Sequence, residues 1–475
     1  MLKSLPTIIQ GGMGAGVSNW SLARAVSKLG QLGVVAGTGL DQILSRRLQD
    51  GDRDGHVRRA LEHFPFPKIA RKILDAHFLP EGRPAGTPYK TPRMHVAGAN
   101  LPAQALCVAA NFVEVFLARE GHSGPIGINF LEKIQMPHLP SLYGAMLAGA
   151  AVVIVGAGIP MEFPAAIEAL AEHRPASYAL NVAGPRDAEP VRMTLDPAAF
   201  LEPGQSLPAL ERPAFLPIVS SATLATMLVR RIKDALAGFV IETSVAGGHN
   251  APPRGQLQLT SDGQPIYGPR DAADLAIFRE LGLPFWLAGG YGAREKLAEA
   301  RALGAAGVQV GTPFALCAES GLEPFLRHRL VAKALAGEAK VFTDPKASPT
   351  GFPFKVAELE GTLSDEAVYR QRKRICDLGF LREVYRKPDG AVGYRCAAEP
   401  EKAYLAKGGR PEDMVGRKCL CNALVANVGM PQLLPDGSHE LPLVTLGDDV
   451  AGLARFCPAG QLDYTAADVV RTLLG

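Results

Sequence analysis

The sequence lacks an excess of charge of either sign. Its 475 residues contain 50 Lys and Arg against 47 Asp and Glu, which gives a formal net charge of +3. The basic residues are scattered, and short runs such as 370–374 are typical of a solvated helix face. Because nucleic-acid-binding chains concentrate positive charge on one face, we expect no nucleic-acid partner.

Long hydrophobic runs and a cysteine framework are also missing. The most apolar segment, 146–160, is interrupted by glycines and is shorter than the roughly 20 residues that a membrane-spanning helix needs. The first residues run directly into a predicted strand, so we expect no secretory leader. The seven cysteines are odd in number and widely spaced, which argues against a disulfide framework. These observations predict reduced thiols, a cytoplasmic location and no membrane partner.

What the sequence does contain is a strand–helix alternation. Short β-branched runs end in small residues and are followed by amphipathic stretches rich in Ala and Leu, which is typical of a parallel sheet. The predicted strands are 7–10, 33–36, 126–130, 151–155, 215–219, 239–242, 285–288 and 308–310. The predicted helices are 20–29, 142–148, 162–172, 223–237, 272–281 and 293–303.

Eight such strands predict an α/β fold of the parallel (β/α)8 TIM-barrel class. A doubly wound open sheet accounts for the alternation nearly as well. The barrel is favoured because almost every strand ends in Gly, Ser, Asn or Thr, and in a barrel those ends meet around one site.

Two insertions interrupt the strand–helix alternation of the barrel, and a separate region comes after the barrel in the chain. We expect the barrel to occupy residues 1–345, with insertions at 41–100, before strand three, and at 177–213. The second insertion contains a small predicted hairpin built from 178–182 and 191–195. Residues 346–475 predict a separate, mainly helical C-terminal region whose role the sequence does not indicate.

Glycine-rich turns follow the first strand and the last two. Gly11, Gly12 and Met13 begin a turn that lets backbone approach a flat ligand, although a flexible barrel turn explains the same residues. Gly289 and Gly290 follow strand seven, and Gly311 and Thr312 follow strand eight. Phosphate binding after strands seven and eight is a recurring barrel feature, because the N–H groups there and the helix dipole favour anions.

Two polar side chains end apolar strands. His249 follows 239–241 in the motif Ala-Gly-Gly-His, which would place an imidazole over the barrel mouth as an acid or base. A histidine satisfied by loop hydrogen bonds is the alternative. Asn129 ends strand three and could bond a cofactor ring or cap a loop.

The cysteines Cys376, Cys396, Cys419 and Cys421 lie near the C-terminus, with Cys457 beyond them. Cysteine thiolates are the usual ligands of zinc and iron–sulfur clusters. However, the sequence contains no Cys-x-x-Cys, only Cys-Leu-Cys, so we expect thiols and no metal site here.

Taken together, these motifs resemble the nitronate monooxygenase (2-nitropropane dioxygenase) family of FMN-dependent barrels. The matching segments run in family order over about the first 345 residues, and they are 8–13, 26–33, 127–130, 246–249, 288–290 and 304–312. By resemblance, Gly11, Gly12 and Met13 would line the flavin ring, Asn129 would contact it, and Gly248 would also bind the cofactor. The amides of Gly289, Gly290, Gly311 and Thr312 would hold its phosphate, and His249 would be the catalytic acid or base.

The resemblance implies an enzyme that oxidises alkyl nitronates with dioxygen to a carbonyl compound and nitrite. Some relatives with the same Gly-Gly-His element instead reduce enoyl thioesters or quinones with NAD(P)H. A flavin-binding module without turnover and a barrel for another phosphate ligand are further alternatives. Expected partners are therefore a small-molecule substrate with O2 or NAD(P)H, and the sequence leaves a homodimer open.

Overall fold

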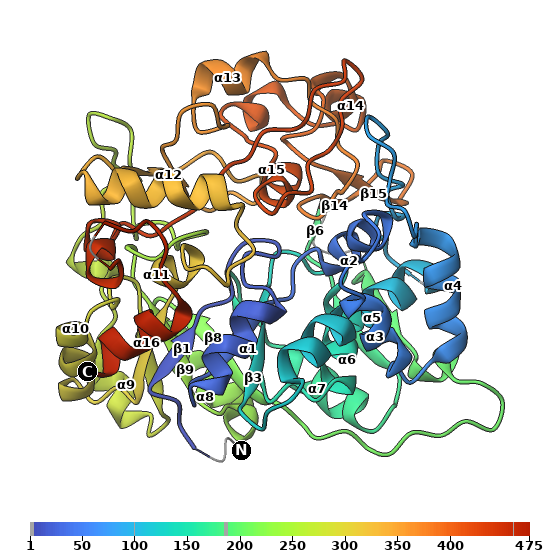
Figure 1. The fold of residues 1–475 in the computed structure, drawn as a ribbon, viewed down its shortest axis with the longest axis horizontal. Helices are drawn as coiled ribbons and strands as arrows, with labels where there is room; N and C mark the ends of the chain where they lie inside the picture. Colours follow the sequence, from blue (N-terminus) through green and yellow to red (C-terminus); the bar gives the residue numbers. More distant parts are fainter. Residues whose placement is uncertain (1–3, 99, 185–188, 459) are drawn as a thin grey trace.

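The computed structural model describes residues 4–98, 100–184, 189–458 and 460–475 (Figure 1). Residues 1–3, and residues 185–188 of the predicted 177–213 insertion, lie outside the described residues.

The centre of the molecule is an eight-stranded parallel sheet with the order β1-β11-β10-β9-β8-β4-β3-β2. Its strands are β1 (Ile8–Gln10), β2 (Gly33–Ala36), β3 (Ile126–Leu131), β4 (Val152–Gly156), β8 (Ala214–Val219), β9 (Phe239–Glu242), β10 (Phe285–Ala288) and β11 (Gly307–Val310). The two edges meet through a parallel bridge between Ile9 and Leu32, where Gln10 N–H donates to the Leu32 carbonyl at 2.9 Å. The predicted barrel is confirmed, and it is nearly closed.

Alternate residues of the short strands fill the barrel interior. Ile9, Val34 and Ile154 belong to one buried cluster inside the sheet, together with Trp286, which is fully buried. The Trp286 indole N–H donates to the Pro6 carbonyl at 2.8 Å, so its single polar atom is satisfied. The barrel is thus a packed core, and a ligand has room only at the strand ends.

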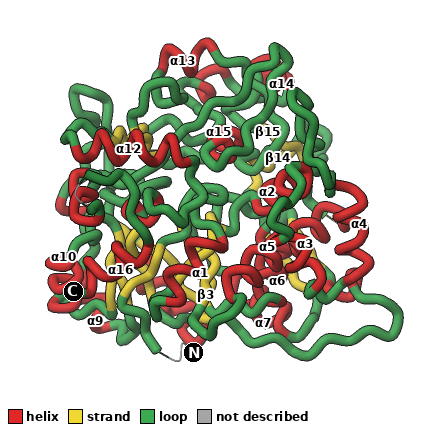
Figure 2. The backbone as a smooth tube through the Cα atoms, in the orientation of Figure 1, coloured by secondary structure: helices red, strands yellow, loops and turns green. Residues whose placement is uncertain are grey.

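Helices surround the sheet, with their apolar faces against it (Figure 2). Those of the barrel layer are α1 (Trp20–Lys28), α5 (Leu101–Arg119), α6 (His138–Leu147), α7 (Phe163–Ala171), α8 (Ala222–Ile232), α9 (Leu275–Glu280), α10 (Arg294–Ala302) and the short α11 (Thr312–Ala315). In the described part of the chain, α5 alone is long and apolar enough to cross a membrane, but 83% of its most apolar window is buried. It packs on α1, α2 (Leu40–Gln49) and α6, as a core helix does.

The segment before strand three is helical in its first half. It contains α2 (Leu40–Gln49), α3 (His56–Glu62) and α4 (Pro67–His77), followed by a loop that leads to α5. The expected hairpin also forms: β5 (Ala176–Ala179) pairs antiparallel with β7 (Arg192–Leu195). Between them β6 (Val182–Ala183) pairs with β14 (Glu383–Arg386), which ties this insertion to the C-terminal region.

The C-terminal region contains helices, as expected, and also strands that the sequence did not indicate. After α12 (Pro324–Leu335), two antiparallel pairs form, β12 (Val341–Asp344) with β13 (Phe354–Ala357) and β14 with β15 (Val392–Arg395). The helices are α13 (Glu366–Gln371), α14 (Glu401–Ala406), α15 (Leu420–Ala426) and α16 (Ala466–Leu474). Figure 1 shows α13 to α15 above the barrel. The short strands have few β-branched residues in period-two alternation, which is why the sequence pattern did not predict them.

The last helix belongs to the barrel layer. α16 packs against α1 and α10, where the eighth helix of a (β/α)8 barrel lies (Figure 1). Its start is a capping box in which Thr465 and Asp468 satisfy each other's backbone N–H groups. The chain between α11 and α16 therefore leaves the barrel, covers its mouth and returns.

Candidate active site

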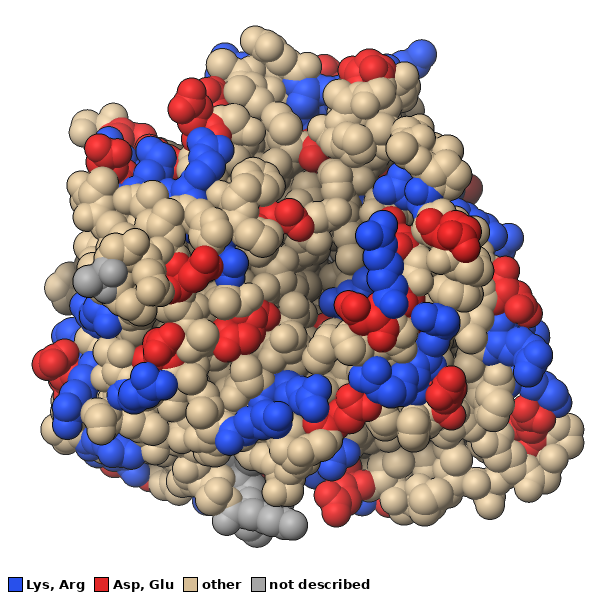
Figure 3. Space-filling view, viewed as in Figure 1, with Lys and Arg blue, Asp and Glu red and all other residues tan. Residues whose placement is uncertain are grey.

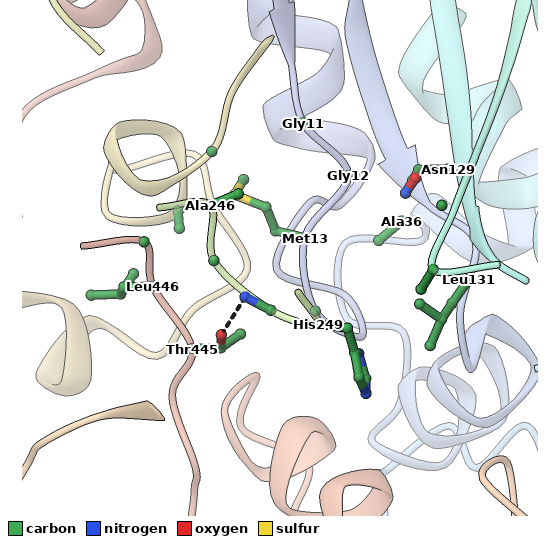
Figure 4. A pocket seen from close by; sticks show the side chains of 18 of the residues that line it. Gly11, Gly12, Met13, Ala36, Asn129, Leu131, Ala246, His249, Thr445 and Leu446 are labelled. Carbon is green, nitrogen blue, oxygen red and sulfur yellow. Dashed lines mark hydrogen bonds between the residues drawn. The ribbon is translucent and has the colours of Figure 1, made fainter. Parts of the chain in front are cut away.

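A cavity of about 240 Å³ lies at the carboxyl ends of the barrel strands. It brings together all ten residues that the sequence singled out, from five different strand ends and the loops after them, and Figure 4 labels five of these residues. These are Gly11, Gly12, Met13, Asn129, Gly248, His249, Gly289, Gly290, Gly311 and Thr312. Their shared location is a structural fact, whereas their individual roles stay predictions.

The turn after β1 lies directly against Asn129. A Cβ atom added to Gly12 would stand 2.3 Å from Asn129 Cβ, so only glycine allows this approach. The amide oxygen of Asn129 is buried and has no hydrogen-bond partner among the described residues. The same holds for the amide oxygen of Gln309, which also lines the cavity. Buried polar atoms usually have partners, so two amide oxygens without one mark a place for a polar ligand.

The turns after β10 and β11 adopt the conformation expected of an anion site. Gly289 and Gly290 have φ values of +87° and +78°, which strongly favour glycine. A Cβ on Gly289 would also stand 2.4 Å from Thr243 Oγ1. Within the described chain, the N–H groups of Gly289, Gly290, Gly311 and Thr312 donate no hydrogen bond. Four unpaired N–H groups in one cavity can hold a phosphate.

No Lys or Arg of the described residues lines this cavity, so its anion site relies on backbone N–H groups. An acidic side chain lies near the turn after β10. The Asp449 carboxylate oxygen Oδ2 would stand 3.6 Å from a Cβ on Gly292, and burial raises the pKa of Asp449. The hydroxyl of Thr312 accepts a hydrogen bond from Gly447 N–H at 2.8 Å. The loop 445–449 thus closes the cavity on the side of the expected phosphate.

His249 sits on the loop after β9 and is held by the C-terminal region. Its Nε2 lies 2.7 Å from Ser348 Oγ, which in turn lies 2.8 Å from Thr350 Oγ1. Its ring packs edge-on against Phe354, with 4.8 Å between centroids. The neighbouring Gly248 N–H donates to Thr445 Oγ1 at 2.8 Å, as Figure 4 shows. The imidazole is therefore fixed in place rather than free to swing.

Two titratable groups at the end of β9 have strongly shifted pKa values. Burial lowers the pKa of His249 to about 4, so the imidazole is neutral near pH 7. Burial also raises the pKa of Glu242 to about 8, so this carboxyl group holds its proton near pH 7. The cavity thus contains a neutral base and a neutral acid, as catalytic sites often do.

The far wall of the cavity comes from the C-terminal region. It is apolar, and its residues are Phe380, Leu381, Leu420, Leu424 and Val425. These side chains and Ser348, Phe354 and Thr445 were missed in the sequence, where no motif links them to the barrel. Ser348 lies in the proline-rich stretch 344–349, and only folding places it beside His249. In Figure 3 charges of both signs are interspersed on the face shown, around a hollow between the barrel and the C-terminal region.

A comparison with known protein families matches a part of the chain that contains several of these residues. Residues 210–346 match the family model described as nitronate monooxygenase. The family resemblance is confirmed for this segment. The matched segment contains His249 and both glycine turns after β10 and β11.

Several solved structures are similar to this chain, at low sequence identity. FabK from Thermotoga maritima is 16% identical, with a TM-score of 0.47 over 100% of this chain and 93% of that chain. The nitroalkane oxidase from Streptomyces ansochromogenes is 15% identical, with a TM-score of 0.46 over 99% and 96%. The enoyl reductase domain of MlnA from Bacillus amyloliquefaciens is 11% identical, with a TM-score of 0.49 over 98% and 92%. No curated protein matches the chain significantly.

Proposed function

We propose that this protein is an FMN-dependent oxidoreductase that oxidises alkyl nitronates with dioxygen, giving a carbonyl compound and nitrite. The observation that carries the proposal is a shared cavity. It places the unpaired N–H groups of the β10 and β11 turns, the amide of Asn129 and the imidazole of His249 around one space. The match of residues 210–346 to the nitronate monooxygenase family supports the same reading.

The residues present suit FMN. The N–H groups of Gly289, Gly290, Gly311 and Thr312 would hold its phosphate, and the Gly11–Met13 turn would lie along its ring. The unpartnered oxygens of Asn129 and Gln309 can accept hydrogen bonds from a ring N–H group. When bound, the flavin supplies the redox chemistry, and the protein supplies position and electrostatics.

His249 is suited to move a proton at the substrate carbon. A nitroalkane must lose its α-proton to become the nitronate that is oxidised, and a neutral imidazole can accept that proton. Nε2 is engaged with Ser348, whereas no described residue bonds Nδ1, so Nδ1 is the nitrogen that would receive it. Ser348 and Phe354 hold the ring in one orientation, which preserves the alignment that proton transfer requires.

The C-terminal wall would exclude water from this site. Phe380, Leu420 and Leu424 are apolar and close the cavity opposite the barrel. A dry cavity strengthens the interaction of His249 and the backbone N–H groups with a charged intermediate. It also suits a substrate with an apolar alkyl chain.

A second function has one observation in its favour. The described cavity lining provides no Lys or Arg to bind a nitronate anion, and its apolar wall would accept an acyl chain equally well. The alternative is an NAD(P)H-dependent flavin reductase of enoyl thioesters or quinones, in which the imidazole of His249, protonated for the transfer, would donate a proton to the substrate.

Anaerobic stopped-flow spectroscopy distinguishes the nitronate-oxidising function from the flavin reductase. The purified protein, loaded with FMN, is mixed with an alkyl nitronate, NADH or NADPH, and bleaching of the flavin absorbance is followed. Rapid bleaching by the nitronate, with release of nitrite when oxygen is admitted, supports the first function. Rapid bleaching by a pyridine nucleotide, with none by the nitronate, would establish the reductase instead.

A further inference from the structure

Four of the seven cysteines line one small cavity in the C-terminal region: Cys376, Cys396, Cys419 and Cys421. They come from three separate segments, the loop after α13, the end of β15 and the start of α15. No cysteine pairs with another in a disulfide. Folding thus assembles four free thiols that the sequence keeps apart by up to 45 positions.

The remaining three cysteines lie elsewhere and have ordinary partners. Cys107 Sγ lies 3.2 Å from Ser141 Oγ, and the thiols of Cys317 and Cys457 donate to backbone carbonyls of their own helical turns. These three behave as small apolar residues with weak S–H donors. The four clustered thiols therefore form a distinct set.

The four thiols are buried, which raises the pKa of each, and groups that partly offset this effect surround them. Arg372 lies against Cys419, and Arg382 lies close to Cys376. Backbone N–H groups also lie near three of the sulfurs, that of Ala398 near Cys396, that of Asn422 near Cys419 and that of Leu381 near Cys421. N–H groups on cysteine sulfur are a means by which proteins stabilise and tune bound clusters.

The segments that carry the thiols are fastened to one another. Asn422 Nδ2 donates to Asp377 Oδ1 at 2.8 Å, which ties the Cys376 loop to α15. The Cys419 N–H donates to the Tyr369 hydroxyl at 3.0 Å. A buried ion pair between Arg372 and Glu440 adds a third link. The positions of the thiols are thus set by the surrounding structure.

The arrangement of the four thiols bears on whether they bind a single metal ion or a polynuclear metal centre. A tetrahedral zinc with bonds of about 2.3 Å needs its sulfurs within about 4 Å of one another. Throughout the described chain, no group of three or more His, Cys, Asp or Glu side chains is already arranged to hold one metal ion. Four thiols that line one cavity without being arranged around a single ion favour a polynuclear centre, whose ligands stand further apart.

We propose that Cys376, Cys396, Cys419 and Cys421 bind an iron–sulfur cluster. Four cysteine thiolates are the usual ligand set of such clusters, and the positive charges of Arg372 and Arg382 offset their negative charge. The absence of Cys-x-x-Cys does not oppose this, because the ligands come from three segments. Leu381, Leu420 and Cys421 line both this cavity and the candidate active site, so the cluster lies beside the larger cavity.

Chemical analysis of the full-length protein tests the proposal independently of any enzyme activity. The protein is produced with ample iron, purified without oxygen, and assayed for iron, acid-labile sulfide and zinc. We expect iron and sulfide in equal amounts, about two or about four of each per chain, and an electron paramagnetic resonance signal in either the oxidised or the reduced state. Protein stripped with a chelator should regain the same content when incubated with Fe²⁺ and sulfide.

Substitutions assign the ligands. Cys376→Ser and Cys396→Ser should each lower bound iron by about tenfold or more, whereas Cys457→Ser should retain the content of the unsubstituted protein. Circular dichroism verifies folding, and the analysis of the unsubstituted protein stands even if a variant fails to fold. One zinc per chain without sulfide, a disulfide among these cysteines in the oxygen-free protein, or no iron after reconstitution would each overturn the proposal.

Discussion

His249 of the barrel and Ser348 of the C-terminal region are joined by a contact of 2.7 Å between Nε2 and Oγ. The two residues are 99 positions apart in the chain, and Ser348 is fully buried. This contact links the chemistry expected of the barrel mouth to the region that covers it. The C-terminal region is therefore part of the candidate active site and not an appendage.

The first prediction concerns this contact. Ser348→Ala should lower kcat by about tenfold with little change in KM, because the imidazole loses one hydrogen bond that orients it. Ser348→Thr retains a hydroxyl and should recover most of the activity, while the exposed Ser438→Ala serves as a control. Steady-state kinetics with a neutral nitroalkane, whose α-proton His249 would accept, provides the measurement. An equal loss in Ser348→Thr and Ser348→Ala would indicate a packing role instead.

The second prediction concerns the imidazole itself. His249→Ala should keep FMN bound but lower turnover of a neutral nitroalkane by roughly 100-fold or more, because the group that accepts its α-proton is removed. The unsubstituted enzyme should show no inflection near pH 6.5 and should lose activity only as the pH falls toward 4, because the pKa of His249 is about 4. His328→Ala, at a histidine paired with Asp463 on the surface, is the control. Unchanged turnover of His249→Ala across this pH range would remove the residue from the mechanism.

The third prediction concerns the phosphate turn. Gly290→Val should abolish tight FMN binding, because φ is +78° and a side chain would crowd Val245 Cγ1, 3.4 Å from the new Cβ. Gly282→Val is the matched control, since Gly282 has φ of +71° and its Cβ would meet no atom within 4 Å. Both substitutions strain the backbone, but only the first intrudes on the proposed site. Fluorescence titration with FMN measures the difference, and tight binding by Gly290→Val would place the phosphate elsewhere.

The fourth prediction uses the buried carboxyl group of Glu242. Its pKa is raised from about 4.3 in the unfolded chain to about 8 in the folded protein. A raised pKa means that the folded state binds the proton more tightly, so the stability associated with Glu242 is lost as the pH rises from about 4.5 to 8. In Glu242→Gln the side chain does not titrate, so this contribution to the pH dependence of stability is absent.

Thermal denaturation from pH 5 to 9 tests whether this stability decreases as the pH rises. The Tm of Glu242→Gln minus that of the unsubstituted protein should increase with pH and level off above about 8. The same exchange at the exposed Glu280 should show no comparable trend. A difference that stays constant across the range would contradict the buried, protonated state of Glu242.

The barrel could be predicted from the sequence because its signals are local. Each strand is a short β-branched run that ends in a small residue, and glycine in the sequence indicates the turns at Gly289 and Gly311. For the same reason, the ten residues expected at the strand ends do share a cavity. Their roles as cofactor ligands and acid or base await the experiments above.

The rest could not be predicted because it depends on contacts between distant segments. Nothing in the stretch 344–349 indicates that Ser348 meets His249, and nothing in the spacing of Cys376 and Cys421 indicates a shared cavity. The position of α16 in the barrel layer is likewise set by packing against α1 and α10, since its own amphipathic pattern would suit many partners.

The central claim is that one cavity holds a flavin between the barrel mouth and the C-terminal region. Its most direct test is to purify the full-length protein, record its absorbance spectrum, and identify the released cofactor by chromatography and mass spectrometry. The account predicts a yellow protein, or one that becomes yellow on incubation with FMN, with one FMN per chain. A colourless protein that FMN cannot reconstitute would contradict it.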